Sequence, residues 1–212
     1  MTAPDWLVAR PIAHRGLHDA AKGILENTIS AAEAAIAGGF PIECDVQLTA
    51  DGDAVVFHDF TLDRLTNETG AVSERTSAAL SEVAIVGSAA DRIPTLAAFL
   101  DRVGGRVPLV IEIKSRFDGD MRLADRTCEV LRRYRGPFCV KSFDPAVVAR
   151  VRAVAPGAVR GIVAESTYAH PSYDALSPEQ KHALANLLHF EESRPHFLSW
   201  HVRDLPAAPP YL

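Results

Sequence analysis

An alternating stretch between residues 40 and 59 constrains the fold of this chain more than any other feature. It contains two short apolar runs on either side of a turn at residues 50–53. In the first run, residues 42–48, polar and apolar residues alternate strictly, so Glu43, Asp45 and Gln47 share one face of a predicted strand. Two carboxylates on one face of a buried strand repel each other and lose their hydration. A bound cation would remove both penalties, which makes metal binding the first functional hypothesis.

The composition predicts one globular domain that spans residues 1–212. Hydrophobic residues make up 48% of the chain and charged residues 23%, so a sizeable core can form. The net charge of −5 argues against a general nucleic-acid binder, although a local basic patch would still accommodate a small phosphorylated ligand. The three cysteines are odd in number and widely spaced, which argues against a disulfide framework.

The sequence shows neither a secretory leader nor a membrane span. The N-terminal segment lacks an apolar stretch of signal-peptide length, and no run approaches the roughly 20 apolar residues of a membrane helix. We therefore expect a cytoplasmic protein that does not insert into a membrane. The sequence leaves open whether the chain forms a homo-oligomer.

Apolar runs typical of strands alternate with helical patterns along most of the chain. The predicted strands are 11–13, 42–48, 54–58, 109–114, 138–140, 159–164 and 197–200. The predicted helices are 29–37, 94–103, 121–134, 146–154 and 178–190. This alternation predicts a parallel sheet with helical crossovers, interrupted by a long, insertion-like connection at residues 60–107. Asn27 and Thr28 are interpreted as residues that shape the start of the first helix.

Polar side chains gather at the C-terminal ends of several predicted strands. They are His14, Glu43, Asp45, His58, Glu112 and Lys114. Functional groups at the C-terminal ends of different strands are typical of a TIM-type β/α barrel. Seven strands are predicted where a barrel has eight, so we expect a barrel whose eighth strand is missing from this chain.

Three acidic residues from two predicted strands are candidate metal ligands. In a barrel, Glu43, Asp45 and Glu112 would converge on one point. Three carboxylates form a hard oxygen site that suits Mg²⁺ or Ca²⁺. The alternative is that three unrelated polar residues face a solvated barrel mouth.

Two histidines and two basic residues complete the candidate site. His14 and His58 each end a predicted strand, and such a pair can supply a general acid and a general base near neutral pH. Either one alone would more simply be a structural histidine. Arg15 can grip phosphate oxygens with its planar fork, and Lys114 adds a second positive charge. Together with a dication, these groups suit phosphoryl transfer to water or to a hydroxyl group.

The motifs occur in an order that resembles a known family. They are His14-Arg15-Gly16, Glu26-Asn27-Thr28, residues 42–49, Val56-Phe57-His58-Asp59, residues 62–66, Gly70, residues 93–96 and Ile111-Glu112-Ile113-Lys114. In this order they resemble the glycerophosphodiester phosphodiesterase family. The resemblance is specific from about residue 12 to 114, continues more weakly through residues 142–144, and thins beyond them.

The resemblance implies a TIM-type barrel that hydrolyses glycerophosphodiesters to an alcohol and glycerol 3-phosphate with a divalent cation. Residue by residue, it implies that the metal ligands are Glu43, Asp45 and Glu112. It implies that the acid/base pair is His14 and His58, and that the phosphate contacts come from Arg15 and Lys114. Family members usually finish with an eighth strand that carries a tryptophan-containing motif, and this sequence stops before one.

Three functional alternatives follow from the same residues. The first is hydrolysis of a small glycerophosphodiester, either by direct attack of water or through a cyclic phosphate formed by the substrate's own 2-hydroxyl. The second is a lyase-like reaction on lysophospholipid head groups, which an apolar substrate channel would favour. The third is a barrel that binds metal and phosphate without turnover.

Overall fold

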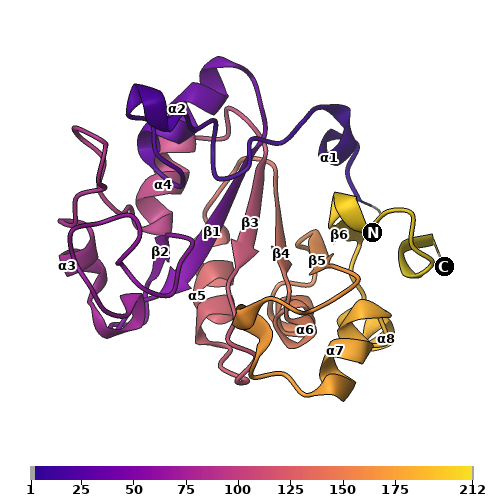
Figure 1. The fold of residues 1–212 in the computed structure, drawn as a ribbon. Helices are drawn as coiled ribbons and strands as arrows, with labels where there is room; N and C mark the ends of the chain where they lie inside the picture. The colour runs from indigo at the N-terminus through magenta and orange to yellow at the C-terminus, as the bar shows by residue number, and fades with distance from the viewer. Residues whose placement is uncertain (1–2, 212) are drawn as a thin grey trace.

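The computed structural model describes residues 3–211 and contains one six-stranded sheet (Figure 1). Its strands lie in the order β2-β1-β3-β4-β5-β6. They are β1 (Ile42–Leu48), β2 (Ala54–Val56), β3 (Leu109–Ile113), β4 (Phe138–Ser142), β5 (Arg160–Ala164) and β6 (Phe197–Trp200). All neighbouring strands are parallel except β1 and β2. The α/β class and the largely parallel sheet are as predicted.

Helices connect most of the strands. They are α1 (Trp6–Ala9), α2 (Ile29–Ala37), α3 (Ser77–Leu80), α4 (Leu96–Val103), α5 (Arg122–Leu131), α6 (Pro145–Val154), α7 (Pro178–Ala185) and α8 (Phe190–Ser193). The hydroxyls of Thr28 and Thr95 accept hydrogen bonds from the third residues of α2 and α4, which fixes where both helices begin. Among residues 3–211, no helix combines the length and the apolar character needed to cross a membrane.

The strict alternation of β1 places its two sets of side chains on opposite faces of the sheet. Ile42, Cys44 and Val46 are fully buried and belong to the main hydrophobic core. That core also takes apolar residues from β3, β4, α4 and α5. The polar residues of β1 are buried on the other face, so they meet other polar groups rather than the main core.

The connection between β2 and β3 folds around a small core of its own. Val55, Phe57, Leu62, Leu80 and Ile93 are buried together in this second cluster. The connection forms the purple and magenta lobe beside β2 in Figure 1. It is therefore a packed lobe rather than an extended loop, and its last helix, α4, packs into the main core.

Three predicted elements differ from the structure. The predicted strand 11–13 is reduced to a single parallel bridge between Ala13 and Ile42. The predicted strand 54–58 ends at Val56 and runs antiparallel to β1, because only a short turn at 50–53 joins the two strands. The predicted helix 178–190 divides into α7 and α8, since Leu187 between them has a φ of 54° that a helix cannot contain.

The sheet is TIM-barrel-like but open. Within residues 3–211, hydrogen bonds pair β6 with β5 and with no other strand. The prediction of an incomplete barrel agrees with this open sheet. The count of seven barrel strands was wrong, because β2 is antiparallel and the first predicted strand is only a bridge.

Candidate active site

Three carboxylates converge on one face of the sheet, where β1 and β3 pair. Asp45 on β1 lies opposite Glu112 on β3 in the parallel register, and Glu43 lies two residues earlier on the same face of β1. One oxygen from each of the three lies within 4.8 Å of the others. All three residues are at most 4% exposed. The structure thus brings together the three residues that the sequence nominated as metal ligands.

Two lysines bridge these carboxylates. The Lys114 ammonium lies 2.8 Å from Asp45 Oδ1 and also contacts Glu112 Oε1. The Lys141 ammonium lies 3.1 Å from Glu43 Oε1 and 3.1 Å from Glu112 Oε2. Burial opposes ionisation of Glu112, but the two ammonium groups outweigh it and lower its pKa to about 2. Each lysine therefore holds a pair of acidic side chains in place.

The donor set fits a hard divalent cation. Burial raises the pKa of Glu43, and the neighbouring Asp45 and Glu112 carboxylates raise it further against the effect of Lys141. Glu43 Oε1 is buried and accepts no hydrogen bond, although the Lys141 ammonium lies near it. A buried, unsatisfied carboxylate oxygen beside two further carboxylates is the environment in which Mg²⁺ or Ca²⁺ is bound.

The two histidines reach the same cavity from different segments. His14 follows the Ala13 bridge, and its Nε2 lies 3.9 Å from Glu43 Oε2. His58 follows β2, and its Nδ1 lies 2.6 Å from Asp59 Oδ1. Partial desolvation and the Arg15 guanidinium lower the pKa of His14, even though two thirds of its side chain is exposed. Both rings line a cavity of about 540 Å³.

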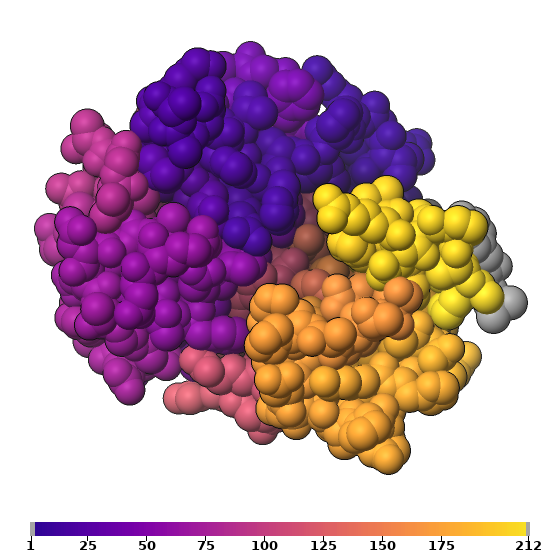
Figure 2. All heavy atoms as spheres, viewed as in Figure 1, coloured from indigo at the N-terminus to yellow at the C-terminus, as the bar shows by residue number. Residues whose placement is uncertain are grey.

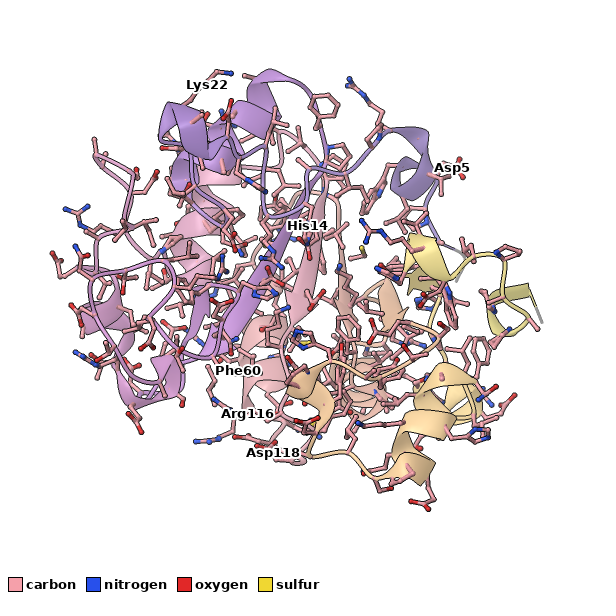
Figure 3. All side chains as sticks on the ribbon, in the orientation of Figure 1. Asp5, His14, Lys22, Phe60, Arg116 and Asp118 are labelled. Atoms are coloured by element: carbon pink, nitrogen blue, oxygen red, sulfur yellow. The ribbon has the colours of Figure 1, made fainter. Side chains whose placement is uncertain are left out.

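That cavity joins most of the residues nominated from the sequence. Its lining includes His14, Arg15, Asp45, His58, Glu112, Lys114 and the unpredicted Lys141. Glu43 faces a neighbouring cavity of about 410 Å³, which also touches His14 and Lys141. In Figure 2 the surface is hollowed between the indigo-to-purple first half of the chain and the orange-to-yellow last part. His14 lies near the centre of the molecule in the matching view of Figure 3.

Arg15 has a strained backbone conformation, and contacts with three acidic residues hold it there. Its φ is 57°, a left-handed conformation that non-glycine residues rarely adopt. Its backbone N–H donates to Glu43 Oε2 at 3.0 Å, and its guanidinium donates to Glu26 Oε1 at 2.7 Å. Its Nε lies 3.5 Å from Asp45 Oδ2. The strain is maintained at the site, where such outliers concentrate.

The comparison with known families agrees with this arrangement. The family model described as "Glycerophosphoryl diester phosphodiesterase family" matches residues 14–198. The chain belongs to this family. It is 34% identical over 180 residues to a glycerophosphodiester phosphodiesterase of Caldanaerobacter subterraneus, covering 79% of this chain and 72% of the relative. It is 32% identical over 194 residues to YhdW of Bacillus subtilis, covering 86% of this chain and 76% of that protein.

Solved structures of similar fold include two phosphodiesterases. A phosphodiesterase of Oleispira antarctica, in complex with the product sn-glycerol-3-phosphate, matches with a TM-score of 0.73 at 22% identity, over 92% of this chain and 75% of that one. A glycerophosphodiester phosphodiesterase of Agrobacterium tumefaciens matches with a TM-score of 0.61 at 29% identity, over 72% of this chain and 64% of that one. These likenesses support the TIM-barrel-like fold of this glycerophosphoryl diester phosphodiesterase family member.

Two site residues of this family member were not predicted from its sequence. Asn27 was interpreted as part of a helix start, but its Nδ2 donates to Asp45 Oδ2 at 2.9 Å and its Oδ1 accepts from the Asp45 N–H at 3.1 Å. Lys141 lies opposite Glu112 in the register of β3 and β4. The predicted strand 138–140 ended one residue short of it. Extending that strand would have revealed another polar side chain at a strand end.

A further arginine, Arg64, links the carboxylate that contacts His58 to the carboxylate that contacts Arg15. Arg64 donates to both oxygens of Asp59, at 2.6 and 2.9 Å, and to both oxygens of Glu26, at 3.0 and 2.7 Å. Burial opposes ionisation of both carboxyls, yet Arg64 together with His58 or Arg15 lowers each pKa to about 2. Because Asp59 is ionised, the Nδ1 of His58 must carry the proton that it donates.

Proposed function

We propose that this family member hydrolyses glycerophosphodiesters to an alcohol and glycerol 3-phosphate at the cavity described above. The observation that carries the proposal is that three mutually close carboxylates, two histidines and two lysines meet at one site. Its relatives include a named glycerophosphodiester phosphodiesterase, and one structural neighbour holds sn-glycerol-3-phosphate as its product.

The charges of the site support binding of a phosphodiester anion. Three carboxylates are balanced by Arg15, Lys114 and Lys141, which lie within 3.5 Å of them. Glu43, Asp45 and Glu112 would hold a divalent cation, Mg²⁺ or Ca²⁺, which when bound stabilises negative charge on phosphate oxygens. With such a cation the site carries excess positive charge, which attracts the substrate. Arg15 and Lys114 then hold the phosphate in line for attack.

The two imidazoles supply proton transfer in this proposal. Asp59 fixes the Nδ1–H of His58, so the Nε2 of that ring is free to exchange a proton with the substrate. The ring of His14 is largely exposed in the cavity wall and can exchange protons with a ligand or with water. One histidine removes the proton from the attacking oxygen, and the other protonates the leaving alcohol.

Release of glycerol 3-phosphate from glycerophosphocholine tests the function. We expect release with Mg²⁺ or Ca²⁺ and loss of release with a chelator. His14→Ala and His58→Ala should each lower kcat by about 10²- to 10⁴-fold, because each removes an acid or base from the reaction. His18→Ala removes an exposed histidine outside the cavity lining and serves as the matched control.

The products separate the competing reactions. Direct attack by water releases choline and gives glycerol 3-phosphate as the only phosphorus-containing product. Attack by the substrate's 2-hydroxyl also releases choline but gives a transient cyclic phosphate, which ³¹P NMR resolves before water opens it to glycerol phosphate. Tight binding of glycerophosphocholine without product would instead support a binding protein. A wild-type rate in either His14→Ala or His58→Ala would refute the assignment of acid and base.

A further inference from the structure

Three aromatic side chains line the cavity without any role in the proposed chemistry. Phe117, Phe143 and Tyr173 are partly exposed there, and together they form what we call the aromatic corner. Phe117 follows β3, Phe143 follows β4, and Tyr173 comes from a short 3-10 turn at Pro171–Tyr173 after β5. Rings from three separate segments thus meet in the cavity that holds the carboxylates.

The rings stand at steep angles to one another. The centroids of Tyr173 and Phe117 are 6.3 Å apart at an interplanar angle of 75°, and those of Tyr173 and Phe143 are 5.9 Å apart at 49°. Behind them, the buried Tyr168 packs edge-on against Tyr173 at 4.9 Å. The three rings are therefore packed at angles to one another, and Tyr168 supports Tyr173, so the aromatic corner is not a parallel stack.

The position of Phe117 is maintained against backbone strain. Its φ is 57°, which is an outlier for so bulky a residue. Its N–H donates to Ser115 Oγ at 2.9 Å, and Ser115 Oγ in turn donates to Asp144 Oδ2 at 2.5 Å. Asp144 also caps α6, so the strained turn is tied to a rigid helix. Strain that is maintained in this way at a cavity wall indicates a functional use of the ring.

Two acidic residues act on the ring of Tyr173, in a cavity that Arg15, Lys114 and Lys141 also line. Burial raises the pKa of Tyr173, and the carboxylates of Glu165 and Glu112 raise it further, so both acids act on this ring. Glu112 also belongs to the candidate metal site, so the aromatic corner and that site lie in one cavity. The neighbouring Phe60 already carries a cation over its face, since Arg116 Cζ lies 4.1 Å from its ring centroid; Figure 3 shows these two residues side by side.

We propose that the aromatic corner of Phe117, Phe143 and Tyr173 binds the quaternary ammonium of the leaving alcohol, so that choline diesters are the preferred substrates. The proposal rests on the proposed function and specifies its substrate class. Ring faces attract a trimethylammonium group through their quadrupoles and provide apolar surface for its methyl groups. A polyol head group carries no positive charge for the ring faces to attract.

An uncharged isostere isolates the effect of the positive charge. The substrate pair is glycerophosphocholine and its 3,3-dimethylbutyl analogue, in which carbon replaces the ammonium nitrogen. We expect wild-type kcat/KM to favour the choline diester by about 2- to 30-fold, the range of a cation–aromatic contact. Tyr173→Leu and Phe117→Leu should bring this ratio to about 1, whereas Tyr173→Phe, which keeps the ring, should retain it.

The outcomes separate this proposal from the proposed function. A ratio of about 1 in the wild-type protein, or a ratio that survives both leucine substitutions, overturns the aromatic corner as a cation subsite. If the wild-type protein hydrolyses neither compound, the proposed function fails instead. The same pair is then titrated calorimetrically into the His58→Ala variant, where a Kd ratio of about 2- to 30-fold supports the subsite and an equal Kd refutes it. Thermal unfolding of each variant confirms that it is folded.

Discussion

Lys141 determines how three buried carboxylates coexist in one site. Its side chain is 10% exposed, and its ammonium lies within 3.1 Å of both Glu43 and Glu112. Burial alone would favour the neutral amine, but the two carboxylates outweigh it and raise the pKa of Lys141. The side chain therefore stays charged, and it occupies a position between two candidate metal ligands.

Lys141→Met is expected to destabilise the protein most when no divalent cation is present. Removing one partner of a buried ion pair typically costs about 3 to 5 kcal/mol, because the remaining charges lose their compensation. Bound Mg²⁺ or Ca²⁺ would restore part of that compensation. Urea unfolding with chelator and with cation measures the difference. Lys22→Met is the control, since its ion pair with Asp19 is exposed and its removal should change stability little. Equal losses in the two variants would contradict the bridging role.

Arg64 supports His58 and Arg15 through two carboxylates, so its loss should lower activity with little change in fold. We expect Arg64→Ala to reduce kcat on the order of 10- to 100-fold, the usual effect of removing a supporting group that orients a functional histidine. Without the guanidinium, the pKa of Asp59, which Arg64 helps to hold at about 2, rises toward its ordinary value, so Asp59 becomes protonated and stops orienting His58 at a higher pH. The acid limb of the pH–rate profile should therefore move to higher pH.

A second arginine in the same connection provides the comparison for Arg64. Arg75 pairs with Glu68 and is 44% exposed, against 46% for Arg64, but it contacts no residue of the site. Arg75→Ala should leave both kcat and the pH profile unchanged. If Arg64→Ala gives the same unshifted profile as Arg75→Ala, Arg64 contributes only to the structure of the lobe.

At the scale of elements, the strands that carry the carboxylates could be predicted because the alternation that identifies each strand lies within a few consecutive residues. Strict alternation in β1 fixed which face each side chain takes, and the register then followed from parallel neighbours. The antiparallel orientation of β2 was missed although the short turn at residues 50–53, visible in the sequence, leaves no room for a crossover between β1 and β2. The contacts of Arg64 with Glu26 join residues 38 positions apart, and no sequence period reports such a pairing.

The loop that carries Glu26 is tied to the lobe by a carboxylate whose pKa is shifted. The pKa of Glu26 falls from 4.5 to about 2 in the folded protein. A lowered acid pKa stabilises the fold above pH 4.5, and that contribution is lost as the pH falls from about 4.5 to about 2. The contribution is at most about 3 kcal/mol, and screening at the half-exposed Arg64 reduces it.

Glu26→Gln should therefore flatten the acid dependence of stability. We expect the variant to be less stable than the wild-type protein at pH 7, with the two converging toward pH 2 because the wild-type carboxylate is then protonated. Free energies of unfolding from urea titrations between pH 2 and 7 give the two curves. Glu68→Gln, in an exposed pair with Arg75, should follow the wild-type curve. If the free energy of unfolding of Glu26→Gln ran parallel to that of the wild-type protein from pH 2 to 7, the pKa of Glu26 would not be shifted by folding.

At the scale of the whole molecule, the fold class followed from the sequence but the closure of the barrel did not. Alternating strand and helix patterns are sufficient to predict a parallel α/β sheet. Closure depends on tilt and register summed over all strands, which no single segment encodes. The carboxylates and Lys141 came together regardless, because β1, β3 and β4 are adjacent and their register places Asp45, Glu112 and Lys141 side by side. Catalytic geometry here depends on the centre of the sheet rather than on its ends.

An open sheet should be unevenly stable, and hydrogen exchange measures this directly. The five residues of β3 are all buried between β1 and β4, whereas the four residues of β6 are all partly exposed and, within residues 3–211, pair only with β5. Amides of β3 should therefore exchange only through global unfolding, and those of β6 through a lower-energy local opening. Mass spectrometry of peptides covering 109–113 and 197–200 resolves the two. A divalent cation held by Glu43, Asp45 and Glu112 should slow exchange in β3 further, because it stabilises the folded state without contacting β6. Equal protection of both strands would mean that the sheet behaves as one cooperative unit despite its open edge.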